Sequence, residues 1–249
     1  MTGPPASSNA IVRALDEDSA QWGIPRPLAW ILLIAPLVLM AIMMVVGALD
    51  SAVFHFFIDE DHLIEWLQFF AILIGSIAFA LAAIQANRLG RRRLAVLYAI
   101  VAVGAFLAAG EEISWGQRLL GFATPVALEE INHQAESNLH NISAVQRLFN
   151  LGEALAGLYG LAIPLLWRWS PFRSRAERWL DPLLVPPLCL VVLFFLPFAY
   201  RAIRLTLLPD VGERIVELGE VPELTFYVGV MIVGLVTVRR LRTPTGAAS

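Results

Sequence analysis

Acidic, hydroxyl and imidazole side chains gather in the longest connection between two apolar segments of the chain. Near its start stand Glu111, Glu112 and Ser114, residue types that can serve as acid, base and nucleophile. Towards its end stand Glu136 and His140. Carboxylate and imidazole ligands together suit Zn, Mn or Fe. We predict that Glu111, Glu112, Ser114 and His140 are catalytic, and that a divalent metal ion binds Glu111, Glu136 and His140.

Polar and aromatic side chains near these residues are candidates for substrate binding. The set is Trp115, Gln117, Arg118, Asn138, Asn141, Glu65 and Gln68. A tryptophan suits the interface between membrane and water. On a continuous helix Arg118 and Glu111 would share a face, so the arginine could neutralise the acid. Ser114 can be a nucleophile only if a base such as His140 comes within hydrogen-bond reach.

A second pattern in this connection places four metal-ligand types on one helix face. A helix over residues 127–142 would hold them within about 60° of arc. At i, i+4, i+7 and i+11 they are Glu129, His133, Glu136 and His140. The ends of this stripe would lie about 16 Å apart along the axis, so a single ion would need ligands from another element. The alternative is an amphipathic helix on the membrane surface with a solvated acidic face.

The acidic residues at the starts of other segments also have a structural explanation. Glu65, Glu153 and Glu223 lie in or near the first turns of expected helices, where the helix dipole favours negative charge. The adjacent Glu111 and Glu112 could likewise begin an interfacial helix. Together these acids would make one side of the protein acidic and suited to a cation or a cationic partner.

The elements that must position these residues are membrane-spanning helices. The 249 residues are 58% hydrophobic and 16% charged, which is too apolar for a soluble domain of this size. A spanning helix needs about 20 mostly apolar residues. Six stretches qualify: 28–49, 63–86, 94–109, 148–167, 183–200 and 221–238. We predict an all-α membrane protein, a six-helix transmembrane bundle with an interfacial helical loop between the third and fourth helices.

The distribution of arginine predicts the orientation of this bundle. Thirteen of the 18 basic residues, all of them Arg, fall in alternate connections and beside the two termini. Loops that stay in the cytoplasm are enriched in Lys and Arg. Sixteen of the 21 acidic residues fall on or near the other side. Both termini are therefore expected in the cytoplasm, and the polar connection outside.

The remaining organisation follows from this topology. Residues 1–23 are small, polar and acidic, and we expect a disordered cytoplasmic tail there. Residues 24–240 form the transmembrane domain, and residues 241–249 form a cytoplasmic C-terminal tail. Gly152, Ala156 and Gly160 form a small-residue stripe that permits close helix approach. The expected partners are the lipid bilayer and a lipid substrate, and no nucleic acid. No oligomeric state follows from the sequence.

The two polar segments carry a resemblance. They are Gly-Glu-Glu-Ile-Ser-Trp-Gly-Gln-Arg, and Glu-x-Asn-x-Gln-x-Glu-x-Asn-Leu-His-Asn at residues 130–141. In these two segments the chain resembles a family of uncharacterised multi-pass bacterial membrane proteins. The resemblance implies a bacterial cytoplasmic (inner) membrane location and no particular reaction. It also implies one motif set: Glu111, Glu112, Ser114, Trp115, Gln117, Asn132, Gln134, Glu136, Asn138, His140 and Asn141. His133 and Glu129 fall outside that set, which argues against the four-ligand stripe.

Two kinds of function remain open at this point. The first is an integral membrane enzyme, metal-dependent or not, that acts on a lipid or lipid-linked substrate at the outer leaflet. The second is a non-enzymatic membrane scaffold or partner-binding subunit whose polar loop is structural. Ion or solute transport is less favoured, because the middles of the spans hold almost no ionisable groups and a pathway usually needs some.

Overall fold

The computed structural model describes residues 10–58, 62–125, 137–139, 142–206 and 213–242. These residues form helices and connections, without a β-strand among them. In chain order the elements are α1 Ala10–Trp22, α2 Arg26–Leu49, α3 Ser51–Ile58, α4 Leu63–Arg88, α5 Arg92–Glu112, η1 Ser114–Gly116, α6 Gln117–Leu120, α8 Ser143–Trp167, α9 Ser170–Ala176, η2 Pro182–Leu184, η3 Leu188–Leu190, α10 Val191–Thr206, α11 Glu213–Glu217 and α12 Glu220–Arg242.

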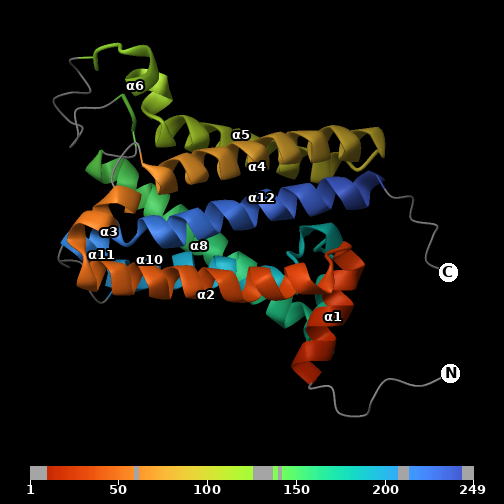
Figure 1. Ribbon diagram of the computed structural model, residues 1–249. Helices are drawn as coiled ribbons and strands as arrows, with labels where there is room; N and C mark the ends of the chain where they lie inside the picture. The colour runs from red at the N-terminus through yellow and green to blue at the C-terminus, as the bar shows by residue number, and fades with distance from the viewer. Residues whose placement is uncertain (1–9, 59–61, 126–136, 140–141, 207–212, 243–249) are drawn as a thin grey trace.

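The long helices form one bundle (Figure 1). Six helical segments, containing α2, α4, α5, α8, α10 and α12, are long and apolar enough to cross a membrane. The predicted all-α, six-helix membrane fold is therefore confirmed. Helix α4 packs between α5 and α12, while α8 packs on α10, which also contacts α12 and α2. Many helix faces around this core carry exposed leucine, isoleucine and valine side chains, as expected for surfaces that contact lipid.

Small residues let the central helices approach closely. A Cβ atom added at Gly234 of α12 would lie 2.9 Å from the Cβ of Ala78 on α4. One added at Gly75 would lie 3.3 Å from the backbone of Met231. Without a hydrophobic driving force between helices in lipid, such close packing is a main source of helix association.

One end of the bundle gathers arginine residues, and we call it the arginine-rich end. Helix α1 and the end of α12 lie together there (Figure 1). The guanidinium of Arg239 donates to the backbone oxygen of Gly23 at 2.7 Å. Arg91, between α4 and α5, forms an ion pair with Asp181, which precedes η2. The connections that the sequence predicts on one side therefore do meet at one end, and the assignment of that end to the cytoplasm stays a prediction.

The opposite end holds the last turn of α5, helix α6 and the first turn of α12, and we call it the acidic end (Figure 1). Helix α5 ends at Glu112, and α12 has Glu220 and Glu223 in its first turn. These positions lie far from the arginine-rich end along the bundle. Charge is therefore separated along the long axis of the described fold.

Helix α1 forms where the sequence predicts a disordered tail. Its buried residues, Leu15, Ser19 and Trp22, lie on one face at spacings of four and three. They pack against a cluster that includes Leu190 of η3. The Asp18 side chain accepts a hydrogen bond of 2.7 Å from the backbone N–H of Leu188. The segment is low in apolar content, yet the helical spacing of its few apolar residues suffices to dock it.

The small-residue stripe of α8 contacts α10 over only part of its length. A Cβ atom at Gly160 would lie 2.2 Å from Cγ of Phe194, and one at Gly157 would lie 3.0 Å from the backbone oxygen of Phe194. At Gly152 nothing lies within 4 Å of the added atom. Close approach is therefore confirmed at Gly160, whereas Gly152 faces open space.

Replacing Gly160 with alanine should weaken the packing of α8 on α10. The new methyl group overlaps the Phe194 ring, and overpacking of this kind costs about 1–3 kcal/mol. Thermal unfolding of the detergent-purified protein should show a lower midpoint for G160A. The matched control, Gly152→Ala, should leave the midpoint unchanged or raise it, since alanine favours helix over glycine by about 1 kcal/mol. Equal midpoints for the two variants would contradict this packing.

Candidate functional site

An arginine on α10 lies between carboxylates from two neighbouring helices at the acidic end. Arg201 Nε is 2.6 Å from Oε2 of Glu153 on α8, and its Nη2 is 2.7 Å from Oε2 of Glu223 on α12. The side chains are only 15%, 9% and 22% exposed, respectively. Buried charges cost several kcal/mol each unless they are paired and hydrogen-bonded. Arg201 therefore forms ion pairs with two acids and joins three helices.

A tyrosine on α12 extends this pairing to a third acid. The hydroxyl oxygen of Tyr227 lies 2.8 Å from Oε1 of Glu112 and 3.0 Å from Oε1 of Glu223. A hydroxyl group has one hydrogen, so it can donate to only one of the two carboxylates. The other contact is a hydrogen bond only if that carboxyl is itself protonated and donates to the tyrosine oxygen. Both contacts are therefore satisfied when Glu112 and Glu223 share a proton through Tyr227.

We call these residues the carboxylate network: Glu112, Tyr227, Glu223, Arg201 and Glu153. Its members come from four different helices, α5, α12, α10 and α8. Oε1 of Glu153 is buried without a hydrogen-bond partner in the described structure. Such orphaned buried oxygens are uncommon in native proteins, and they mark places where water or a ligand can bind.

Gln68 forms a second polar contact between α4 and α12 near the network. It is fully buried, and its amide nitrogen donates to both the backbone oxygen and Oε2 of Glu220 at 3.0 Å. Its own Oε1 is buried without a hydrogen-bond partner in the described structure. Glu65 lies one turn earlier on α4 and is partly buried. The predicted pair Glu65 and Gln68 thus belongs to the acidic end, beside α12.

The segment after α5 contains an unusual turn. Ser114 and Trp115 have φ values of 46° and 56°, in the left-handed region that non-glycine residues avoid. Trp115 Nε1 donates to Oε1 of Glu111 at 2.8 Å. A Cβ atom at Gly110 would lie 2.8 Å from the Trp115 ring. The absence of a side chain at Gly110 therefore leaves room for the ring. The continuous helix through Glu111 and Arg118, considered from the sequence, is wrong, because α5 ends at Glu112.

This turn binds the chain at residues 137–139 by hydrogen bonds. Oε2 of Glu111 accepts from the Leu139 N–H at 2.6 Å. Ser114 Oγ accepts from Asn138 Nδ2 at 3.0 Å, and Oε1 of Gln117 accepts from the Ser137 N–H at 2.6 Å. Glu111, Ser114 and Asn138 are nearly fully buried. We call these contacts the loop lock, and they bring the two predicted motif segments together.

The structure therefore divides the predicted site residues into two groups. Glu112 and Gln68 lie inside the bundle, whereas Glu111, Ser114, Gln117 and Asn138 form the loop lock with Trp115. The adjacent Glu111 and Glu112 point to different neighbours, because successive residues of a helix differ by about 100° around its axis. Ser114 contacts an amide, and the predicted base His140 lies outside the described residues.

Several further candidates also lie outside the described part of the chain. These are Glu129, His133, Glu136, His140 and Asn141, together with the side chain of Arg118. Among the residues that are described, no group of three or more His, Cys, Asp or Glu is placed to hold a metal ion. The predicted metal ligands Glu136 and His140 are not among those residues, so this metal site stays a prediction.

Two members of the carboxylate network were not found as site residues from the sequence. From the sequence, Arg201 is only one of the five arginines expected on the outer side, and no role is predicted for Tyr227. One feature of the sequence could have identified Arg201: it is an ionisable residue near the end of an apolar span. Such a residue is usually buried against a partner. Glu153 and Glu223 have a helix-dipole explanation from sequence, and for Glu223 in the first turn of α12 this holds. Their contact with Arg201 adds a role that spacing within one helix cannot reveal.

Comparison with known proteins adds no relative to this description. No protein-family model, no curated protein and no solved structure matches the chain.

Replacing Arg201 with glutamine should destabilise the bundle strongly. It leaves the carboxylates of Glu153 and Glu223 buried without their cation, which typically costs about 3–5 kcal/mol. The double variant Arg201→Gln, Glu153→Gln should recover part of that loss, since it removes one orphaned charge. Arg204→Gln, one turn further along α10, is the matched control and should change stability by about 0.5 kcal/mol or less. Denaturant unfolding in micelles gives these values, and equal losses for R201Q and R204Q would contradict the pairing.

Removing the carboxylate of Glu111 should release residues 137–139. Hydrogen bonds to charged groups contribute about 1.5–3 kcal/mol, so amide hydrogen exchange at Leu139 should accelerate about tenfold or more in Glu111→Ala. Glu112→Gln changes the adjacent acid but not the loop lock, and it should leave that exchange rate unaltered. Peptide-resolved exchange measured by mass spectrometry distinguishes the two. An unchanged rate in E111A would show that the loop lock does not hold this segment.

Proposed function

We propose that this protein is an integral membrane enzyme that performs acid–base chemistry on a lipid or lipid-linked substrate at its acidic end. One observation carries the proposal: the Tyr227 hydroxyl bridges Glu112 and Glu223, and both contacts are satisfied only with a shared proton. General acid–base catalysis needs a group that can hold and release a proton at the reacting centre.

The carboxylate network gives its two bridged acids different roles. Arg201 forms an ion pair with Glu223. Among the described side chains, no arginine forms an ion pair with Glu112, so the shared proton belongs more naturally to Glu112. Pairs of carboxyl groups whose surroundings favour different protonation states commonly divide the acid and base roles. In this proposal Glu112 exchanges the proton with the substrate, while Tyr227 relays it and Arg201 acts as a positioning residue.

The position of the network favours chemistry at one membrane face over transport across the membrane. Between the acidic end and the arginine-rich end, the core contains apolar and small residues such as Ala78, Phe79, Ala82 and Ala86. The described residues provide no chain of ionisable groups through this region, and an ion or proton pathway usually needs one.

A membrane-embedded substrate fits the surroundings of the network. Its members project from helices that are long and apolar enough to cross a membrane, so the substrate in this proposal approaches from the bilayer. Trp115 is 40% exposed beside the loop lock, and tryptophan favours the membrane interface. The arginine distribution supports an outward-facing acidic end with both termini in the cytoplasm. The resemblance to multi-pass bacterial membrane proteins supports placement in a bacterial inner membrane.

A non-enzymatic scaffold is the second candidate, and the loop lock favours it. Glu111, Ser114 and Gln117 all hold residues 137–139 through direct hydrogen bonds. Residues used in this way are explained by loop structure alone. On this alternative the polar motif is a structural plug that presents a surface to a partner.

The enzyme proposal is tested by incubating the purified protein with lipid vesicles and profiling the lipids by mass spectrometry. Wild type should convert a lipid species, and Glu112→Gln should lower the rate about 100-fold or more, the scale of general acid–base catalysis. Glu111→Gln keeps the neighbouring position polar outside the network, and it should retain most of the activity. Conversion that is equally fast in E112Q would exclude Glu112 as the acid or base. A wild-type protein that alters no lipid would favour the scaffold.

A further inference from the structure

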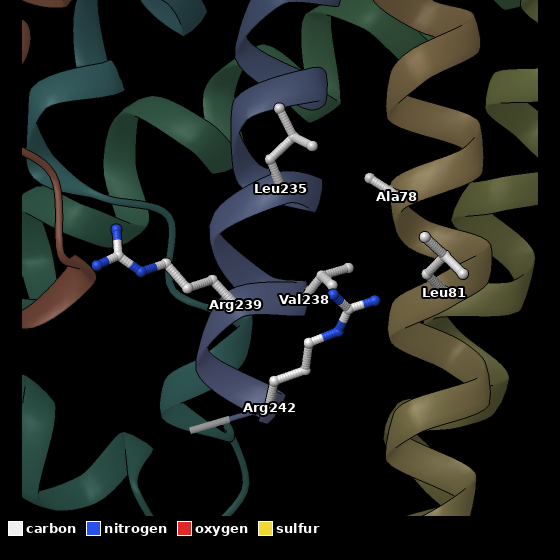
Figure 2. Close-up of a pocket in the computed structure, with 6 residues that line it drawn as sticks. All are labelled: Ala78, Leu81, Leu235, Val238, Arg239 and Arg242. Carbon is white, nitrogen blue, oxygen red and sulfur yellow. The ribbon is translucent and has the colours of Figure 1, made fainter. Parts of the chain in front are cut away.

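A groove of about 450 Å³ lies between α4 and α12 at the arginine-rich end (Figure 2). Its lining residues are Ala78, Leu81, Leu235, Val238, Arg239 and Arg242. Apolar side chains form its walls, and two arginines come from the last turn of α12. The groove begins beside the close contact of Gly234 with Ala78, where large side chains replace the small ones.

The apolar walls of the groove face the surroundings of the bundle. Leu81 and Leu235 are 42% and 47% exposed, and both lie on transmembrane segments. In a bilayer, exposed apolar side chains at such positions contact lipid acyl chains. Leu81 and Leu235 are therefore placed to contact lipid from the two walls of the groove.

The two arginines take different directions. In Figure 2 the Arg242 side chain reaches toward α4, beside Val238 and Leu81, while the Arg239 side chain extends to the other side of α12. Arg239 donates to the backbone oxygen of Gly23, so its guanidinium is engaged in holding the α1–α2 connection. Arg242 is exposed and is the cation that faces the groove.

A second arginine, Arg88, lies at the end of α4, the helix that forms the other wall of the groove. Helices α4 and α12 run in the same direction, so both finish at the arginine-rich end (Figure 1). Arg88 follows Leu81 by seven residues on α4, and Arg242 follows Leu235 by seven on α12. A spacing of seven returns to nearly the same helix face. Each wall thus has an apolar residue within the membrane and an arginine beyond it.

We propose that this groove binds an anionic phospholipid of the bilayer. One acyl chain lies along Leu81 and Leu235, and the phosphate is held by Arg242 with Arg88. Basic pockets between transmembrane helices are suited to anionic head groups, and guanidinium groups match phosphate geometry. This inference concerns the end of the molecule remote from the carboxylate network and does not depend on the proposed enzyme activity.

A lipid suits this groove better than the chain segment that follows it. Residues 243–249, Thr-Pro-Thr-Gly-Ala-Ala-Ser, contain no large apolar side chain that could match the walls. A soluble anion would satisfy Arg242 but would leave the apolar walls unfilled. A phospholipid supplies both the charge and the apolar chain.

The test uses the full chain in bilayer discs with equal amounts of phosphatidylglycerol and phosphatidylcholine of identical acyl chains. After gentle release, native mass spectrometry counts the lipids that each protein retains. Wild type should retain phosphatidylglycerol in preference, and Arg242→Gln should reduce that retention about fivefold, as expected for one arginine at a membrane surface. Arg92→Gln, an exposed arginine at the same end, is the matched control and should have no such effect.

A second variant tests the groove rather than its charge. Leu81→Trp adds bulk to the apolar wall without changing charge, and it should also reduce phosphatidylglycerol retention. Thermal unfolding verifies that the variants remain folded. Equal retention of both lipids by wild type, or equal losses in R242Q and R92Q, would overturn the proposal. So would undiminished retention in L81W, or increased retention when residues 243–249 are deleted, because the last result would identify that segment as the occupant.

Discussion

A largely buried guanidinium group between two largely buried carboxylates is the constraint on which the acidic end of this protein depends. Arg201 cannot remain in the bundle unpaired, and neither can Glu153 or Glu223. Because the three residues belong to α10, α8 and α12, satisfying the charges fixes how these helices are rotated and how far they slide. The same pairing leaves the tyrosine bridge to Glu112 with one proton to share. Structural and chemical roles therefore meet in one set of atoms.

Charged residues make different kinds of contact at the two ends of the bundle. At the arginine-rich end, arginines bind backbone oxygens and acidic partners near the surface, as Arg239 and Arg91 do. At the acidic end, carboxylates contact Arg201 and Tyr227 inside the bundle. Between them, small residues such as Gly75 and Gly234 allow close helix contact without polar groups. This separation explains how an apolar bundle can carry a polar site at one face.

Much of the fold could be predicted from sequence, because an apolar run of about 20 residues has few options in a membrane. The proximity of Glu111 and Gln117 to residues 137–139 was also accessible, through the pairing of the two motif segments. The Arg201 contacts could not be predicted from sequence, since they depend on the rotation of three separate helices about their axes. The step of about 100° between Glu111 and Glu112 follows from a helix, but their separate partners, residues 137–139 and Tyr227, do not follow from the sequence. The sequence does not predict helix α1, because its docked face contains only a few apolar residues.

The chemistry proposed for the acidic end depends on one proton that Glu112 shares with Glu223 through Tyr227. Infrared difference spectroscopy of the reconstituted protein at neutral pH tests it most directly, through the carbonyl stretching band of a protonated carboxyl group. We expect such a band in wild type and in Glu111→Gln, a shift of the band in Tyr227→Phe, and its loss in Glu112→Gln. Identical spectra for wild type and E112Q would show that Glu112 does not hold the shared proton.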